Sequence, residues 1–306
     1  MFGITKPSGL RGKFGRHKYF EGWFQKVYSV EHNASFIVIY GYATQNAPDK
    51  FGFIQIYIPR QAPHILYFNK NEISCDPRNH SVWMGDNLLT TKSMNIASDD
   101  ISLKLAMKNN HPIPTFKNSM GYAYYVPTLP CYHSVMNVSH HVSGEIHTAN
   151  QSYQLEHELG YMEKNWGTSF PKRYCWLQAV DPLDSRTSLL FSQAEIDWIG
   201  SSFLRHVGHL RFDGKHIDLR ELRKCTISNS ILDETNHSIQ LSGKNIKLEI
   251  HISFQEKVIF KGPTDGNMSR DIIHHTDAQI DVQLNLHGTK RSLQLVGNYE
   301  HIGLFQ

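Results

Sequence analysis

The clearest features of this 306-residue sequence are the ones that it lacks. No apolar run approaches the roughly 18–20 residues that a membrane-spanning helix needs. The first twenty residues carry charges but no continuous apolar segment, so they do not resemble a secretory signal. GxSxG, HExxH, P-loop and GxGxxG motifs are all missing, which leaves hydrolase, protease and nucleotide chemistry without support. We therefore expect a cytoplasmic protein.

The sequence also lacks a large excess of positive or negative charge and closely spaced pairs of cysteines. The formal net charge is only +3, and no Lys/Arg block is interleaved with aromatic residues, so we predict no nucleic-acid partner. No CxxC pair occurs, which favours a reduced setting. The adjacent histidines 140–141 and 274–275 would point to opposite faces of a strand, which makes poor chelates, and we predict no metal site. The four cysteines are far apart: Cys75, Cys131, Cys175 and Cys225.

Helical periodicity is absent over three turns or more, and only residues 267–275 could form a short helix. Strand patterns dominate instead. Residues 101–107 alternate between apolar and polar side chains, and Asp213-Gly214 predicts a two-residue hairpin. The chain is therefore predicted to be all-β, with antiparallel barrel or sandwich units and little helix. We expect a lead-in at 1–18, an N-terminal unit at 19–160 and a C-terminal unit at 161–306, with their junction at 161–179.

The stretch from Tyr161 to Ala179, YMEKNWGTSFPKRYCWLQA, combines tryptophans, fixed charges, a glycine and a proline. No single helix or strand period explains this mixture. It is typical of a buried corner or of a pocket floor, and the residue types alone leave both alternatives open.

Three shorter segments also have a structural and a functional interpretation. In KYFEGWFQKV (18–27), Glu21 and Trp23 either close the end of a barrel or line a pocket, and the structural role is favoured because concave sites are few per protein. Asp86 follows Trp83-Met84-Gly85, which favours a turn. His133 follows a proline and a tyrosine closely and is expected to be a packed residue, since a Cys–His nucleophile pair needs spatial support.

Together, YFEGWFQKV, the Trp83–Asp86 turn and EKNWGTSFPKRYCWLQA resemble the tocopherol cyclase family. That family carries an FEGWY-type opening, a W-G-D element and an EKNWG-x-x-FP-x-x-W-x-W-x-Q centre in the same order. The resemblance runs from about Tyr19 to the C-terminus. It implies two lipocalin-like, calycin-type β units packed together, and cyclisation of a prenylated hydroquinone to a chromanol without redox change or cofactor. Gln25 and Tyr174 depart from the family pattern, which weakens the inference about the substrate most.

Closing a chromanol ring requires a carboxyl group to protonate an alkene, so the acid must be kept neutral near pH 7 by an apolar pocket. Glu21 is the first candidate, because Glu163 has Lys172 or Arg173 as a potential partner that would keep it ionised. Asp86 is the third candidate acid.

The remaining chemistry concerns the cation and the phenol. Lys164 or His133 would remove or stabilise the phenolic proton. Tryptophan faces stabilise a carbocation, and aromatic side chains would bind the substrate. The expected substrate-binding residues are Trp23, Trp83, Trp166, Trp176 and Tyr174.

Two functions follow from these residues. The first is an intramolecular cyclase or isomerase acting on a prenylated phenol or another isoprenoid. The alternative is a lipocalin-like binding protein that holds an apolar or isoprenoid ligand without chemistry. Peripheral contact with membrane lipid and the oligomeric state stay open in both.

Overall fold

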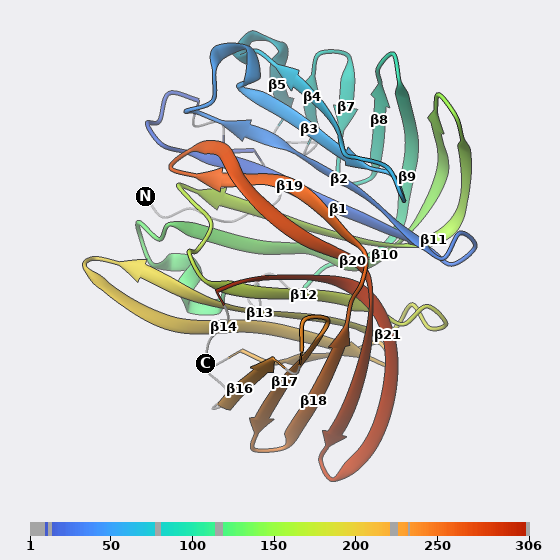
Figure 1. Ribbon diagram of the computed structural model, residues 1–306, viewed down its shortest axis with the longest axis vertical. Coiled ribbons are helices and arrows are strands. Elements are labelled where there is room, and N and C mark those ends of the chain that lie inside the picture. The colour runs from blue at the N-terminus through green and yellow to red at the C-terminus, as the bar shows by residue number, and fades with distance from the viewer. Residues whose placement is uncertain are drawn as a thin grey trace. The chain divides into compact units, whose positions relative to one another are not determined.

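The computed structural model describes residues 10–11, 14–76, 81–113, 119–220, 226–231 and 233–303, and it is built from antiparallel β-strands (Figure 1). The predicted all-β fold is confirmed. Helix in the described residues is limited to the short 3₁₀ turns η1 (Pro48–Lys50), η2 (Lys70–Glu72) and η4 (Gly121–Tyr125). None of the described helices has the length and apolar character to cross a membrane. The short helix expected at 267–275 is wrong, since these residues lie in strand β20 (Asn267–Leu286).

The chain divides into two compact units. Unit 1 comprises residues 1–113, 131–170 and 261–270, and unit 2 comprises residues 114–130, 171–260 and 271–306. The boundary expected at residue 161 falls inside strand β11, which runs unbroken over Ser152–Gly167 and remains in unit 1. The stretch 161–179 is thus shared, with its first part in unit 1 and the rest in unit 2.

Unit 1 contains an 11-stranded sheet in the order β4-β3-β2-β1-β11-β10-β9-β8-β7-β6-β5. In this order each pair of neighbouring strands is also consecutive in the chain, except for β1 and β11. The bounds are β1 (Phe20–Ser29), β2 (Ala34–Ala43), β3 (Gly52–Tyr57), β4 (His64–Phe68), β5 (Ile73–Asp76), β6 (Ser81–Met84), β7 (Asn87–Leu89), β8 (Ser93–Ala97), β9 (Ile101–His111), β10 (Cys131–Thr148) and β11 (Ser152–Gly167).

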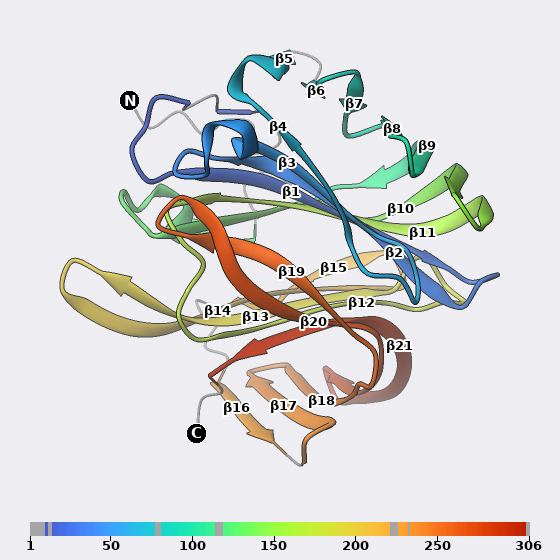
Figure 2. The same cartoon turned by 45° about the horizontal axis from the view of Figure 1, so that its top comes forward.

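Unit 2 contains a second antiparallel sheet in the order β15-β14-β13-β12-β21-β20-β18-β17-β16, with β19 paired to β20. Figure 2 shows β16, β17 and β18 following one another in this sheet. The Asp213-Gly214 hairpin is confirmed, because both residues have positive φ and Phe212 pairs with Lys215. The bounds are β12 (Tyr174–Val180), β13 (Ser188–Trp198), β14 (Ser201–Phe212), β15 (Lys215–Asp218), β16 (Thr226–Ile231), β17 (Asn236–Gly243), β18 (Ile246–Ser253), β19 (Lys257–Thr264), β20 (Asn267–Leu286) and β21 (Thr289–Ile302).

The interior face of unit 1 follows from strand alternation. The apolar residues of β9 at 101, 103, 105 and 107 are buried, while the lysines between them are exposed. Met107 lies opposite Val142, and Leu103 lies opposite Ile146, and both partners are fully buried. Because directly opposite residues share a face of the sheet, the register carries this interior face across β10 and β11 to β1.

Unit 2 has an almost entirely apolar core. On β12 the core side chains are Cys175, Leu177 and Ala179, which join Phe191 and many aliphatic residues of the other strands. The alternate side chains of β12, including Trp176, therefore point to the face opposite this core.

Candidate functional site

The two longest sequence motifs pair with each other in unit 1. Strand β1 and strand β11 are antiparallel neighbours, with Glu21 opposite Trp166 and Trp23 opposite Lys164. Residues 20–28 therefore lie directly beside the first part of the central stretch. Since opposite residues share a face, the side chains of these four residues all lie on the interior face of unit 1.

Glu21 and Lys164 form an ion pair in this interior, and both side chains are 0% exposed. The Tyr42 hydroxyl donates a hydrogen bond of 2.9 Å to Glu21 Oε2. The Arg11 backbone N–H lies 2.8 Å and 3.1 Å from the two carboxylate oxygens and donates to them. The carboxylate of Glu21 is thus held by three donor groups, so the expectation of an unpaired acid at this position is corrected.

Lys164 lies between two tryptophan faces. Its Nζ is 4.6 Å from the ring centroid of Trp23 and 5.4 Å from that of Trp166, which is cation–π distance. Burial lowers the pKa of Lys164 to about 8, Glu21 opposes this shift, and the positive charge of Arg11 adds to it. The ammonium therefore holds its proton weakly enough to exchange it near neutral pH.

Arg11 is a member of this site that the sequence did not reveal. Its guanidinium carbon lies 4.5 Å from the Trp166 ring centroid. Its Nε and Nη2 atoms are buried and have no hydrogen-bond acceptor among the described residues. The site therefore combines two cations with one carboxylate and has unused donors. Arg11 stands in an irregular segment ten residues before Glu21, and no periodic pattern points to it.

Tyrosines complete the aromatic walls. Trp23 stacks on Tyr40 with ring centroids 5.1 Å apart, and Trp166 stacks on Tyr132 at 5.5 Å. The alternation of the segment 35–44 could have indicated that Tyr40 shares a face with Tyr42. These stacked pairs fix the orientation of the two tryptophans.

Glu163, the residue before Lys164, points to the opposite face of β11 because neighbouring strand residues alternate. Its carboxylate lies 2.9 Å from His133 Nε2 and accepts hydrogen bonds from Tyr161 at 2.6 Å and from Asn165 at 2.9 Å. Burial acts to raise the pKa of Glu163, but His133 and these hydrogen bonds outweigh it and lower the pKa below its ordinary value. Glu163 is therefore an ionised, structurally bonded carboxylate.

Glu163 is thus paired, as one alternative predicted, but its partner is His133 and not Lys172 or Arg173. Lys172 binds Asp197 at 2.8 Å, and Arg173 lies 3.6 Å from Glu195. His133, expected either as a packed residue or as an acid–base group, is the partner that Glu163 uses. It lies with Glu163, on the face opposite the Glu21–Lys164 pair.

The Trp83–Asp86 turn lies away from the interior site. Asp86 is exposed in the turn between β6 and β7, after Gly85 with φ 57°. Trp83 is half-buried and alternates with Val82 and Met84, which occupy the interior face. Neither Asp86 nor Trp83 is brought to Glu21 and Lys164, and the turn role is the one that the geometry supports.

Tyr174 and Trp176 belong to unit 2. The Tyr174 hydroxyl donates to Glu300 Oε2 at 2.8 Å, and His274 Nδ1 lies 2.6 Å from Glu300 Oε1. Trp176 lies 5.8 Å from the His274 ring. His274 is also bound to Asn298 at 2.7 Å, so both of its ring nitrogens are engaged. These residues form a polar cluster of unit 2.

The described residues offer no group of three or more His, Cys, Asp or Glu side chains arranged to hold a metal ion. The interior site of unit 1 contains one carboxylate, two cations and aromatic rings. Cys225 lies outside the described residues.

Comparison with known proteins agrees with the family resemblance. Residues 108–191 match the family described as Tocopherol cyclase-like. The fold is similar to that of an AttH-like protein from Nitrosomonas europaea, with a TM-score of 0.57, 14% identity and coverage of 99% of both chains. It is also similar to kievitone hydratase from Nectria haematococca, with a TM-score of 0.53, 8% identity and coverage of 99% of this chain and 95% of that one. No curated protein matches the sequence.

Proposed function

This chain is tocopherol cyclase-like over residues 108–191, and from that premise we propose that unit 1 catalyses ring closure of a prenylated phenol by proton transfer to an isoprenoid C=C bond. The observation that carries the proposal is the buried Glu21–Lys164 ion pair, which lies against the faces of Trp23 and Trp166. A buried ion pair is costly to maintain, because two ions must leave water. Its presence in an aromatic interior supports a chemical role.

The pair can act as both acid and base. In the resting site Lys164 carries the proton, and Glu21 is a carboxylate. When an apolar substrate excludes water, separated charges become more costly, so the proton moves from Lys164 to Glu21 and both groups become neutral. Glu21 then holds the neutral carboxyl group that alkene protonation needs, and Lys164 holds a neutral amine.

The reaction then returns the pair to its starting state. Glu21 donates its proton to the less substituted alkene carbon, where a C–H bond forms as the π bond breaks. The phenol oxygen attacks the resulting tertiary cation to form the C–O bond, and its proton passes to the Lys164 amine. No electrons are gained or lost, and the product is an isomer of the substrate.

The aromatic walls stabilise the cation. Trp23 and Trp166 present ring faces to the site that already hold the Lys164 ammonium at 4.6 Å and 5.4 Å. Each cation–π contact with a carbocation is worth about 0.5–2 kcal/mol in such an environment. The stacked partners Tyr40 and Tyr132 keep these faces in place before the cation forms.

Arg11 has the donors to orient the phenol. Its buried Nε and Nη2 atoms have no acceptor among the described residues, and its backbone N–H already binds Glu21. A phenol oxygen held by this guanidinium is more acidic and lies on the carboxylate side of the site. Arg11 thus supports a substrate that bears an acidic oxygen beside its prenyl chain.

The pH profile and product analysis test this function. Incubation with a panel of prenylated hydroquinones should yield a product of unchanged mass and new retention time by chromatography and mass spectrometry. The kcat/KM should fall above about pH 8, where Lys164 loses the shared proton. Glu156→Gln, at an exposed position on the neighbouring strand β11, is the matched control for Glu21→Gln. Folded protein that converts no member of the panel would refute the proposal.

One observation favours the second candidate, a non-catalytic binding protein. Glu21 accepts hydrogen bonds from Tyr42 and Arg11 in addition to Lys164, so its bonding is complete without a ligand. In that case the same walls hold an apolar ligand, and native mass spectrometry of protein purified from cells would show a co-purifying lipid without turnover. Glu21→Gln would then change binding or stability and leave no activity to lose.

A further inference from the structure

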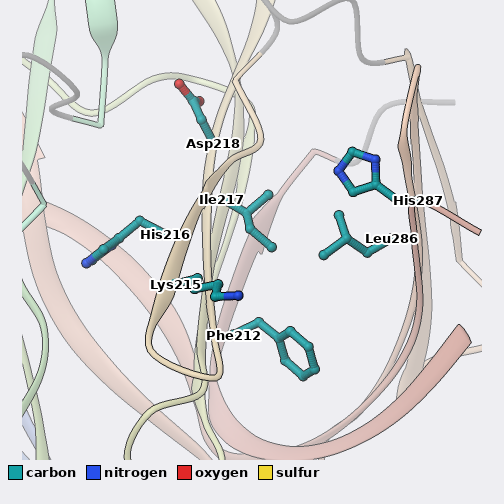
Figure 3. A pocket seen from close by; sticks show the side chains of 7 residues that line it. All are labelled: Phe212, Lys215, His216, Ile217, Asp218, Leu286 and His287. Atoms are coloured by element: carbon teal, nitrogen blue, oxygen red, sulfur yellow. The ribbon is translucent and has the colours of Figure 1, made fainter. Parts of the chain in front are cut away.

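Unit 2 contains a pocket of about 400 Å³ that the function proposed for unit 1 does not use. It lies where the β14–β15 hairpin faces the end of β20 (Figure 3). Volumes of about 300–1,000 Å³ are typical of small-molecule sites. The side chains that line it are Phe212, Lys215, His216, Ile217, Asp218, Leu286 and His287.

The base of this pocket is apolar and closed. Phe212, Ile217 and Leu286 are half-buried and pack against the hydrophobic core of unit 2. Beneath them the core side chains are fully packed, with Leu210 0% and Leu284 2% exposed. A ligand can therefore occupy only the space above these three side chains, and it must present an apolar surface to them.

The charged side chain that faces the space of the pocket is that of Lys215. Figure 3 shows Lys215 on one wall and His287 on the facing wall, while His216 and Asp218 point away from the space between them. The carboxylate of Asp218 accepts a 2.8 Å hydrogen bond from Arg220 Nε and is paired with that guanidinium. Asp218 therefore does not neutralise Lys215, and the pocket favours an anion over a cation.

The geometry points to a binding site for an amphipathic carboxylate of medium chain length, separate from the site in unit 1. The alkyl chain lies on Phe212, Ile217 and Leu286, and the carboxylate accepts hydrogen bonds from Lys215 and, at its opposite edge, from His287. The two requirements come from different residues: the apolar base selects the tail, and Lys215 and His287 select the head group.

Titration calorimetry of the full chain with decanoate tests this assignment, with acetate as the probe of the head group alone and decan-1-ol as the probe of the tail alone. We expect decanoate to bind with 1:1 stoichiometry and at least about tenfold more tightly than either probe. Lys215→Glu should weaken decanoate binding by about tenfold or more and leave decan-1-ol binding unchanged. Leu286→Trp should fill the pocket and remove the binding of both.

Lys290→Glu is the matched control, since Lys290 is an exposed lysine of the neighbouring strand β21 that does not line the pocket. It should leave the affinity within twofold of the unchanged chain. Equal effects of Lys215→Glu and Lys290→Glu, or decanoate binding that survives in a folded Leu286→Trp variant, would overturn the site. If Leu286→Trp does not fold, the comparison of the two lysine variants decides alone.

Discussion

Both units are built on a large antiparallel β-sheet, but the side chains in their interiors differ. Unit 1 encloses the charged groups of Glu21 and Lys164 among aromatic rings. Unit 2 builds its antiparallel sheet around an apolar cluster, and His237, which is bound to Tyr299 of this cluster at 2.8 Å, has its pKa lowered to about 4 by burial and by His301. The charged Glu300 lies opposite Trp176, on the other face of the sheet, so the core face of unit 2 is closed without ions. The buried charges of unit 1 are an addition to the fold, which supports a function for them.

The same comparison explains the two halves of the central motif. Trp166 points to the interior of its unit, whereas Trp176 lies on the face of β12 that is opposite the core. Two tryptophans ten residues apart thus serve different environments. A shared motif does not imply a shared site.

The largest effect is expected where the ion pair of unit 1 is broken. Lys164→Met leaves the Glu21 carboxylate buried without its cation, which should cost about 3–5 kcal/mol of unfolding free energy. The double variant Glu21→Gln/Lys164→Met removes both charges of the pair, so no buried carboxylate is left without its cation, and it should regain most of that stability. Chemical denaturation measures the unfolding free energy of both variants.

The same variants should rank differently in activity than in stability. General acid–base groups contribute about 10²–10⁴-fold to rate, so all variants that lack Glu21 or Lys164 should lose turnover by at least about that much. A double variant that is as unstable as Lys164→Met would contradict a stability cost due to unpaired charge. A stable double variant that is still active would contradict the acid–base role.

A smaller effect is expected at Glu163, on the other face of β11. Glu163→Gln keeps the shape of the side chain but weakens its bonds to His133 and Tyr161, which should cost up to about 3 kcal/mol of stability. The rate per folded molecule should stay within about threefold, since this carboxylate faces away from Lys164. A loss of kcat as large as that of Glu21→Gln, at equal folded fraction, would contradict the proposal that the proton donor lies on the interior face of unit 1.

Features of this site that follow from neighbouring residues in the sequence can be predicted, whereas features that depend on contacts between distant segments cannot. Strict alternation at 101–107 reflects a half-buried strand, so the β-fold and the interior face of β9 could be predicted. Alternation also separates Glu163 from Lys164, but it cannot tell which of the two points inward. That choice is made by the register with β1, a contact between segments more than 130 residues apart.

Arg11 marks the limit of such reasoning. Its backbone donates to Glu21 and its guanidinium covers Trp166, yet it lies in an irregular segment where no period constrains side-chain direction. The partners of Glu163 illustrate the same point, because Lys172 and Arg173 are near in sequence but bind acids of β13. Proximity along the chain suggested those pairs, but both cations bind acids of their own unit, unit 2.

Acid should give unit 2 the charged interior that it lacks at neutral pH. Burial, together with the nearby charge of His301, lowers the pKa of His237 and of His275 to about 4, and burial also lowers the pKa of His301. The unfolded chain therefore binds more protons than the folded chain between about pH 6.5 and pH 4. Stability is full above pH 6.5 and is lost as the pH falls towards 4.

After a discount for solvent screening, each of these histidines should contribute about 1 kcal/mol to that loss, or about 2–4 °C in Tm. His275→Phe should flatten the decline of Tm between pH 6.5 and pH 4.5 and keep the aromatic contact with Phe254. Exposed His287→Phe is the matched control. Equal slopes for the two variants and the unchanged chain would show that the buried imidazoles do not govern the acid sensitivity.

The smallest expected effect is a difference in kcat between tryptophan substitutions in the two units. Trp23→Phe keeps an aromatic face in unit 1 but with a weaker quadrupole, so the cation should lose about 0.5–1 kcal/mol and kcat should fall a few-fold. Trp176→Phe changes a ring that lies beside His274 in unit 2, and kcat should stay within the error of the assay. Steady-state kinetics on the ring-closing substrate, normalised to folded protein, measures both. Equal losses in the two variants would contradict a role for the Trp23 ring face, which lies 4.6 Å from the Lys164 cation, in stabilising the carbocation.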